Sequence, residues 1–203
     1  MGRAGLTSGR VAEAAADLAD KVGFEKITVS ALARSFGVAD ASLYSHVKNV
    51  QDLRTRVAVL AASELADRIA AAVAGRAGKD ALTAFAHAYR DFALAHPGRY
   101  AAAQIQLDPD VAAESAGHRR LAETTYAMLH AYELSEPDLT DAVRLLRSAF
   151  HGFASFEATG GFGFSRDIQA SWERAIEALH AALEHWPAAP SGTTGPAARD
   201  GRA

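Results

Sequence analysis

Apolar residues recur along this chain with the period of an α-helix, and this pattern constrains the fold more than any other feature of the sequence. Val11, Ala15, Leu18 and Val22, for example, form one apolar stripe, whereas charged residues occupy the opposite side of the same helix. Ala, Leu and Arg dominate the composition, and runs of β-branched residues, which favour strands, are absent. We therefore expect an all-α fold.

Helix caps and helix breakers divide this pattern into separate helices. Thr7 or Ser8, and then Thr28, stand where N-caps belong, glycines stand at the breaks, and Ser165 is the expected cap of the last helix. The prolines at positions 97, 109 and 137 are expected in first helical turns. The expected helices span residues 8–22, 29–36, 40–47, 50–74, 80–95, 97–106, 109–132, 136–158 and 166–185.

These helices group into two units. We expect an N-terminal three-helix domain over residues 1–50 and a C-terminal helical bundle over residues 51–186, connected by the long helix 50–74. Residues 187–203 are rich in Pro, Gly, Ala and Thr without periodicity, so we expect a disordered tail there.

Composition excludes several classes of protein. The 203 residues include no Cys, so disulfides and thiolate zinc sites are excluded. No stretch approaches the roughly 20 consecutive apolar residues of a membrane-spanning helix, and the first residues lack the apolar run of a signal peptide. We expect a cytoplasmic protein without a membrane partner.

Charge alone does not indicate a partner. Residues 1–56 carry eight basic and six acidic side chains, whereas the rest of the chain carries 13 basic and 18 acidic ones. A weakly basic segment of this kind is more often a solvated surface than a DNA contact surface.

The segment after the first expected helix has the layout of a helix-turn-helix. Two helices that cross need a small residue at the crossing, which Ala33 provides, and the turn needs a residue tolerant of positive φ, which Gly37 provides. Val38, Leu43 and Val47 then anchor the second helix on the first, and the remaining side chains face outward toward a potential DNA groove. Many helical hairpins share this spacing, so the spacing by itself is a weak signal.

Several short motifs accompany this spacing. They are the helix before it, Gly23-Phe24, Ile27-Thr28-Val29, Leu32-Ala33, Gly37-Val38, Leu43-Tyr44-Ser45-His46-Val47-Lys48-Asn49 and Asp52-Leu53. With these motifs, residues 7–60 closely resemble the N-terminal DNA-binding domain of the tetracycline-repressor (TetR/AcrR) family. The resemblance implies that the second short helix enters the major groove of duplex DNA.

The resemblance also implies a role for each outward position. Contacts to the DNA backbone are implied for Thr28, Ser42, Tyr44, His46 and Lys48, and contacts to base edges for Asp40, Ala41 and Ser45. Val50 departs from the family pattern, which often has a phosphate-contacting Lys there, and Ala39 stands where a capping Ser or Thr is common, so we expect weaker non-specific affinity. Asp40 can accept from a cytosine amino group or cap the helix, and we favour the cap.

The helix expected over residues 136–158 is the second informative element of the sequence. Its apolar side chains span an arc of about 200°, roughly twice what one packing interface needs, so we expect it to be buried on two sides. The segment Phe150-His151-Gly152-Phe153, together with Pro97-Gly98-Arg99-Tyr100, resembles the ligand-sensing domain of a TetR subgroup named for a Trp-His-Gly motif, with Phe150 in place of the Trp. This resemblance implies a homodimer through helices 136–158 and 166–185.

Large side chains on the central helices are the candidate contacts for a small molecule. These candidates are Phe92, Tyr100, Gln104, Tyr126, Phe150 and Phe153. For each of them a place in the hydrophobic core is the more frequent alternative. Glu157 falls within the apolar arc and can meet a cationic ligand or pair with an Arg. His151 can contact a ligand or the other subunit, but we favour a hydrogen bond to a backbone carbonyl.

A di-iron enzyme is the competing interpretation of a helical bundle, and it needs Glu-x-x-His on two helices plus a Glu from each of two others. This chain has one such match, Glu177 and His180, which is expected by chance among 24 acidic residues and 8 histidines. No nucleophile–base arrangement is found, and the glycines at 160–163 lack the flanking strand of a dinucleotide fingerprint. We therefore expect no metal, no cofactor and no enzymatic activity.

Together these patterns predict a one-component transcriptional regulator that acts as a repressor. We expect a homodimer to bind a palindromic DNA operator and to release it when an unidentified small-molecule effector favours a different arrangement of the two DNA-binding domains. The long helix 50–74 is the expected mechanical link between the domains.

Overall fold

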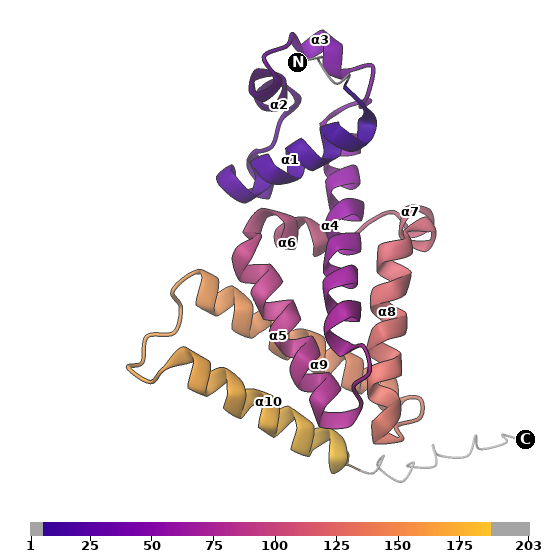
Figure 1. Cartoon of the computed structure of the whole chain (residues 1–203), viewed down its shortest axis with the longest axis vertical. Helices are drawn as coiled ribbons and strands as arrows, with labels where there is room; N and C mark the ends of the chain where they lie inside the picture. Colours follow the sequence, from indigo (N-terminus) through magenta and orange to yellow (C-terminus); the bar gives the residue numbers. More distant parts are fainter. Residues whose placement is uncertain (1–5, 188–203) are drawn as a thin grey trace, which may run out of the picture.

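The computed structural model describes residues 6–187 and contains only helices and loops within that range (Figure 1). The all-α expectation is confirmed. The predicted tail at 187–203 lies outside the described residues, apart from Pro187. Between residues 6 and 187, no helix is both long enough and apolar enough to cross a membrane.

Ten α-helices and two short 3₁₀ helices (η) follow one another in the described range. The N-terminal ones are α1 (Ser8–Val22), η1 (Phe24–Lys26), α2 (Val29–Phe36), α3 (Asp40–Leu43) and α4 (Val50–Val73). The others are α5 (Gly78–Ala95), α6 (Pro97–Ala103), α7 (Pro109–Glu114), α8 (Ala116–Leu129), η2 (His130–Tyr132), α9 (Asp138–Ala158) and α10 (Ile168–Glu184).

The first helices begin and end where the sequence predicts. The Thr7 hydroxyl accepts a hydrogen bond from the Arg10 N–H (3.2 Å), and the Thr28 hydroxyl accepts one from the Ala31 N–H (3.1 Å), so each Thr caps its helix. Gly37 ends α2 at φ 65°, a left-handed conformation that glycine adopts without steric cost.

Several predicted boundaries in the C-terminal half are wrong. The helix predicted over 109–132 is two helices, because the backbone of Ser115 is extended and its hydroxyl caps α8. The last helix is capped by Asp167 and not by Ser165, since the Asp167 carboxylate accepts a backbone N–H of the first turn at 2.7 Å. Pro137 occupies the cap position of α9 and not its first turn.

Two further helices are shorter than predicted. The helix predicted over 40–47 ends at Leu43, because its last turn tightens: the His46 N–H donates to the Leu43 carbonyl, three residues back, at 2.8 Å. The helix predicted over 97–106 ends at Ala103 in a similar tight turn, in which the Gln104 N–H donates to the carbonyl three residues back at 3.2 Å.

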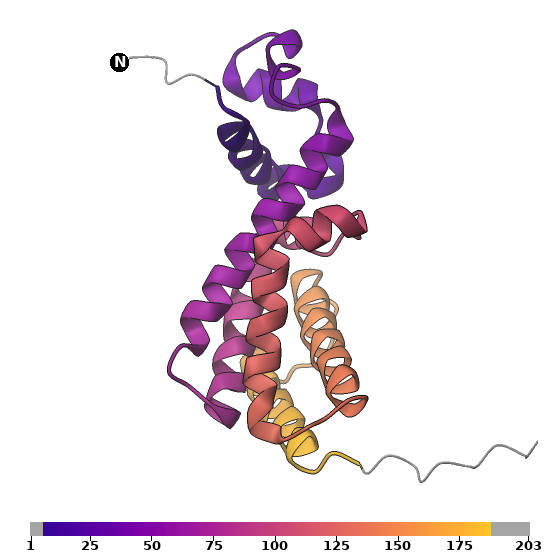
Figure 2. The same cartoon turned by 90° about the vertical axis from the view of Figure 1, so that its right-hand side faces the viewer.

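The helices form an N-terminal unit and a larger body, and α4 runs through both (Figures 1 and 2). Leu53 and Val57 of α4 lie in the hydrophobic core that α1, α2 and α3 share, whereas Leu65 and Ile69 lie in the core of the body. Ala102 of α6 also lies in the first core, although α6 belongs to the body in sequence. Both α4 and α6 therefore connect the two units.

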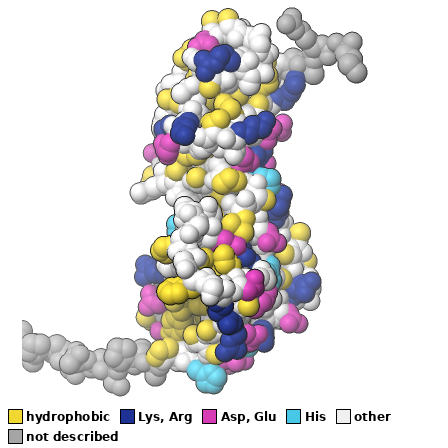
Figure 3. Space-filling view, turned by 90° about the vertical axis from the view of Figure 1, so that its left-hand side faces the viewer, with side chains coloured by type: hydrophobic (Ala, Val, Ile, Leu, Met, Phe, Trp, Pro, Cys, Tyr) yellow, Lys and Arg dark blue, Asp and Glu magenta, His cyan; other side chains and the backbone are white. Residues whose placement is uncertain are grey.

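Within the described chain, α9 is covered on one side only. Leu146, Phe150 and Ala154 are buried against the body. Leu145 and Phe156 lie on the opposite side and are 39% and 58% exposed, although both are large and apolar. Figure 3 looks at the molecule from the side of the α9–α10 loop, where hydrophobic side chains reach the surface of the body. No described residue covers this second side, so its burial stays a prediction.

Candidate DNA-binding surface and ligand cavity

Backbone hydrogen bonds and buried side chains fix the turn between α2 and α3. The Val38 N–H donates to the Ala33 carbonyl at 3.1 Å, which closes the turn around Gly37. Leu43 and Val47 are buried in the core that α1 and α2 form, as the spacing predicts. Because these two residues face inward, the opposite side of α3 is open to solvent.

The predicted DNA contacts surround this open side. Thr28, Asp40, Ala41, Ser42, Tyr44, Ser45 and Lys48 are exposed, and His46 is half-buried. Tyr44 is 56% exposed, so its phenol can reach a DNA phosphate without a change in packing. The Thr28 hydroxyl uses a lone pair for its cap and keeps its proton for a phosphate. The roles of these residues in DNA binding remain predictions.

Asp40 does not cap α3, contrary to the prediction. Ala39 occupies the N-cap position and makes no side-chain cap. The Asp40 carboxylate instead accepts a hydrogen bond from the Ser30 hydroxyl of α2, which joins the two helices of the motif. The carboxylate keeps further lone pairs, so the alternative contact to a cytosine amino group stays a prediction.

Reciprocal capping at the start of α4 positions Lys48. The Asn49 side chain accepts from the Asp52 N–H (2.9 Å), and the Asp52 carboxylate accepts from the Lys48 N–H (2.8 Å). Burial alone would raise the pKa of Asp52, but the Lys48 N–H and the Arg56 guanidinium hold it below its ordinary value. The ionised carboxylate therefore fixes the backbone of Lys48, whose side chain is exposed.

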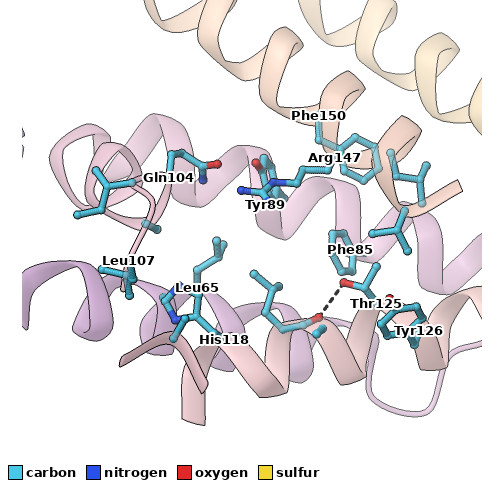
Figure 4. A pocket seen from close by; sticks show the side chains of 18 of the residues that line it. Leu65, Phe85, Tyr89, Gln104, Leu107, His118, Thr125, Tyr126, Arg147 and Phe150 are labelled. Carbon is cyan, nitrogen blue, oxygen red and sulfur yellow. Dashed lines mark hydrogen bonds between the residues drawn. The ribbon is translucent and has the colours of Figure 1, made fainter. Parts of the chain in front are cut away.

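A cavity of about 510 Å³ lies in the body between α4, α5, α8, α9 and the segment that follows α6 (Figure 4). Its volume is typical of small-molecule sites, which span roughly 300–1,000 Å³. Leu65, Phe85 and Phe150 contribute to a mostly apolar wall, and Gln104 and His118 add polar groups at one end. The cavity can therefore hold a small molecule with an apolar body.

The structure separates the predicted ligand contacts into two groups. Gln104, Tyr126 and Phe150 line the cavity. Phe92, Tyr100, His151, Phe153 and Glu157 do not. Phe92 is fully buried in the core of the body. Phe153 packs against Trp172 of α10, with ring centroids 4.7 Å apart.

Tyr100 and His151 belong to a chain of hydrogen bonds that starts at the cavity wall. The hydroxyl of Tyr89, which lines the cavity, lies 2.9 Å from the Tyr100 hydroxyl, and this hydroxyl lies 2.6 Å from His151 Nδ1. His151 thus bonds a phenol and not the predicted backbone carbonyl. Burial raises the pKa of both tyrosines, so both hydroxyls remain protonated at neutral pH.

Glu157 pairs with an arginine, which was one of the two roles that the sequence left open. Both carboxylate oxygens accept from Arg90 of α5, at 2.7 and 2.6 Å, and Gln169 of α10 accepts from the same guanidinium at 2.5 Å. The hydrogen bond from Arg90 to Glu157 raises the pKa of Arg90. This cluster holds α5, α9 and α10 together and does not reach the cavity.

Helix α6 touches both the DNA-binding unit and the cavity. The Arg99 N–H donates to the Asp20 carboxylate of α1 at 2.8 Å, and the Arg99 guanidinium pairs with Asp20, with Asp17 (2.7 Å) and with Glu64 of α4 (2.8 Å). At the other end of α6, Gln104 lines the cavity. This junction was not predicted, because nothing in a single sequence relates Arg99 to carboxylates about 80 residues earlier in the chain.

Comparison with known proteins decides the family. Models described as "Bacterial regulatory proteins, tetR family" and "Tetracyclin repressor-like, C-terminal domain" match residues 11–57 and 82–179. The HTH-type transcriptional regulator YobS of Bacillus subtilis is 33% identical over 181 residues, which are 89% of this chain and 94% of that protein. The chain belongs to the TetR family. It is a DNA-binding transcriptional regulator, as the sequence predicts.

Solved structures of the TetR fold are also similar. A protein of unknown function from Rhodococcus sp. RHA1 has a TM-score of 0.73 and 21% identity, with 90% of this chain and 98% of that chain covered. A TetR variant from Acinetobacter baumannii in complex with minocycline has a TM-score of 0.66 and 22% identity, with 89% and 98% covered. At these identities the likeness shows the fold.

In this TetR-family protein, Glu177 and His180, the one match to the di-iron motif, each contact other side chains. Glu177 pairs with Lys79 of α5 at 2.7 Å. His180 Nδ1 lies 3.0 Å from the Tyr132 hydroxyl, and its Nε2 lies 3.4 Å from the Glu184 carboxylate. Within residues 6–187, no three metal-ligating side chains come together.

Proposed function

We propose that this TetR-family regulator is a one-component repressor: a homodimer holds a palindromic operator through α3 of each subunit, and a small molecule in the cavity releases the DNA. The observation that carries this proposal is the position of α6. Its first turn contacts α1, and the residues at its end line the cavity. The minocycline complex of a protein with the same fold supports the proposed binding of a small molecule.

The outer side of α9 supports a dimer. Leu145, Ala149, Gly152 and Phe156 follow one another at helical spacing on the side that the body leaves uncovered. Gly152 has open space in front of its Cα, so a second helix can approach closely there. Helix α10 carries small side chains at the same spacing, at positions 171, 175, 178 and 182. We propose that α9 and α10 of two subunits form a four-helix interface.

Movement of α6 offers a route from the cavity to the DNA. A ligand that contacts Gln104, or that displaces Tyr89 and through it Tyr100, acts directly on α6. Arg99, the neighbour of Tyr100, transmits a shift to Asp20 of α1 and thus to the whole DNA-binding unit. In one conformation of the dimer, the two DNA-binding units no longer match the spacing of the operator. The ligand releases DNA to the extent that it binds this conformation more tightly than the DNA-bound one.

Replacing Lys48 by Ala tests the DNA-binding surface. Each dimer loses two phosphate contacts, so affinity should fall for all DNA sequences alike, and the slope of log affinity against log salt should flatten by about 2. Fluorescence anisotropy of a labelled operator at several salt concentrations measures both quantities. Tyr44→Ala should weaken binding in the same sequence-independent way, without the change of slope.

Lys21→Ala is the matched control, because Lys21 is exposed at the end of α1 that meets α6. It removes the same charge from the same unit and should leave the salt slope unchanged. If Lys48→Ala behaves like Lys21→Ala, then Lys48 does not contact DNA.

A further inference from the structure

The cavity wall carries a positive charge and, in the described part of the chain, no negative one. Among residues 6–187, no Asp or Glu lines it, and Arg147 of α9 is the only permanently charged residue that does. The side chain of Arg147 extends toward Tyr89 and the cavity, as Figure 4 shows. A cavity with this lining attracts anions and repels cations.

Arg147 has no acidic partner among residues 6–187. No hydrogen bond or ion pair of the described side chains involves Arg147, whereas Arg90 and Arg99 in the same body are each paired with carboxylates. Arg147 is exposed to solvent, yet it lines the cavity, and its charge opposes the rise that burial causes in the pKa of Tyr89 and Tyr100. A guanidinium in this position can form charge-assisted hydrogen bonds with a bound anion.

Two polar side chains from other helices also line the cavity. Gln104 at the end of α6 and His118 of α8 lie at the end of the cavity that is nearer to the DNA-binding unit. Burial, followed by the charge of Arg147, lowers the pKa of His118, so its ring is mainly uncharged at pH 7. His118 Nδ1 lies 2.8 Å from Ser115 Oγ, so the neutral ring can donate to an anion through Nε2 when Nδ1 accepts from the Ser115 hydroxyl.

The rest of the cavity is apolar and aromatic. Phe85 and Phe150 lie on the side of Arg147 away from Gln104 and His118, and Tyr126 lies at that end of the cavity (Figure 4). Leu146 adds to the apolar lining. Burial of an alkyl or aromatic part of a ligand against this wall is favourable. Among the described residues, the wall has no negative charge that could pair with an ammonium group. The polar and apolar ends together define an amphiphilic ligand.

We propose that the effector of this regulator is an amphiphilic carboxylate, whose anionic group pairs with Arg147 and whose apolar body fills the space between Phe85 and Phe150. This inference rests on the proposed function and adds the chemical class of the ligand. The carboxylate lies beside Tyr89 and Gln104, which couple to α6, so the charged group acts at the point where the cavity meets the DNA-binding unit.

Isothermal titration calorimetry with matched probes tests this assignment. Decanoate, decanol and decylammonium share one chain and differ in charge, and 1-naphthylacetate with 2-(1-naphthyl)ethanol forms an aromatic pair. We expect at least one carboxylate to bind at least 10-fold more tightly than its neutral counterpart, because a charge-assisted hydrogen bond contributes enough free energy for roughly a 10- to 100-fold preference. Decylammonium should bind more weakly than decanol.

Arg147→Gln should remove the preference for the carboxylate and leave the affinity for the neutral probe unchanged. Arg144→Gln is the matched control, since Arg144 lies one turn earlier on α9, is exposed, pairs with Asp141 and does not line the cavity. The inference is overturned if neither carboxylate binds better than its alcohol, if decylammonium binds best, or if Arg147→Gln keeps the preference.

Operator binding, measured separately by fluorescence anisotropy, distinguishes this inference from the proposed function. If a carboxylate binds through Arg147 and the operator stays bound, the proposed release fails and the assignment of the ligand class stands. If decylammonium releases the operator, the proposed function stands and the assignment fails.

Discussion

Replacing Phe156 by Arg is expected to convert the dimer into monomers and to weaken operator binding by at least 100-fold. Phe156 is largely exposed in the single chain and lies on the apolar strip of α9 with Leu145 and Ala149. In a four-helix interface, an Arg at this position would be buried without a partner, and this cost exceeds what the interface tolerates. A monomer also loses the gain from binding two half-sites at once, which is about 10²- to 10⁴-fold.

Sedimentation velocity and operator titration measure the two effects. Ala127→Arg is the matched control, because Ala127 is exposed on α8 and does not line the cavity. It should leave both the dimer and the operator affinity intact. If the Phe156→Arg protein, with unchanged circular dichroism, remains a dimer, the interface lies elsewhere.

Replacing Gly98 by Ala is expected to separate α6 from α1 and to destabilise the protein by about 3 kcal/mol. A Cβ atom at Gly98 would overlap the backbone of Ala19 and Asp20, which cannot yield as a flexible side chain would. The shift would also break the bonds between Arg99 and Asp20. The thermal midpoint should fall by about 10 °C, and operator affinity should fall with it.

Gly9→Ala is the control for the glycine substitution itself. Gly9 lies in the first turn of α1, and a Cβ atom added there would have no other atom within 4 Å, so Ala should be neutral or slightly stabilising. Differential scanning calorimetry of both variants gives the comparison. A Gly98→Ala protein as stable as Gly9→Ala would show that α1 and α6 do not depend on this close contact.

Local signals allow much of the N-terminal unit to be predicted from the sequence. The caps at Thr7 and Thr28 and the left-handed turn at Gly37 each depend on one residue type with a specific local preference. The prediction for Asp40 is wrong, because its hydrogen bond to Ser30 spans ten residues and competes with a local cap. Which of these partners a short polar side chain binds depends on how the two helices pack together.

The residues that line the cavity are much harder to predict from the sequence. Periodicity identifies buried faces, but it does not distinguish an aromatic residue that fills a core, such as Phe92, from one that lines a cavity, such as Phe150. Helical periodicity places Arg147 on the polar side of α9, where it is exposed, and only the positions of α5 and α8 show that it also lines the cavity. The junction of Arg99 with α1 likewise depends on how helices far apart in sequence come together.

The most direct test of dimeric operator recognition is operator binding as a function of half-site spacing. Fluorescence anisotropy would compare the palindrome upstream of the regulator's own gene with the same DNA after insertion of five base pairs between the half-sites, which is about half a helical turn. We predict tight binding of the natural spacing and a loss of at least about 100-fold on insertion, since one rigid dimer cannot place both α3 helices on the same face of the DNA. Equal binding of both DNAs by the folded dimer, or binding of neither, would contradict this mechanism.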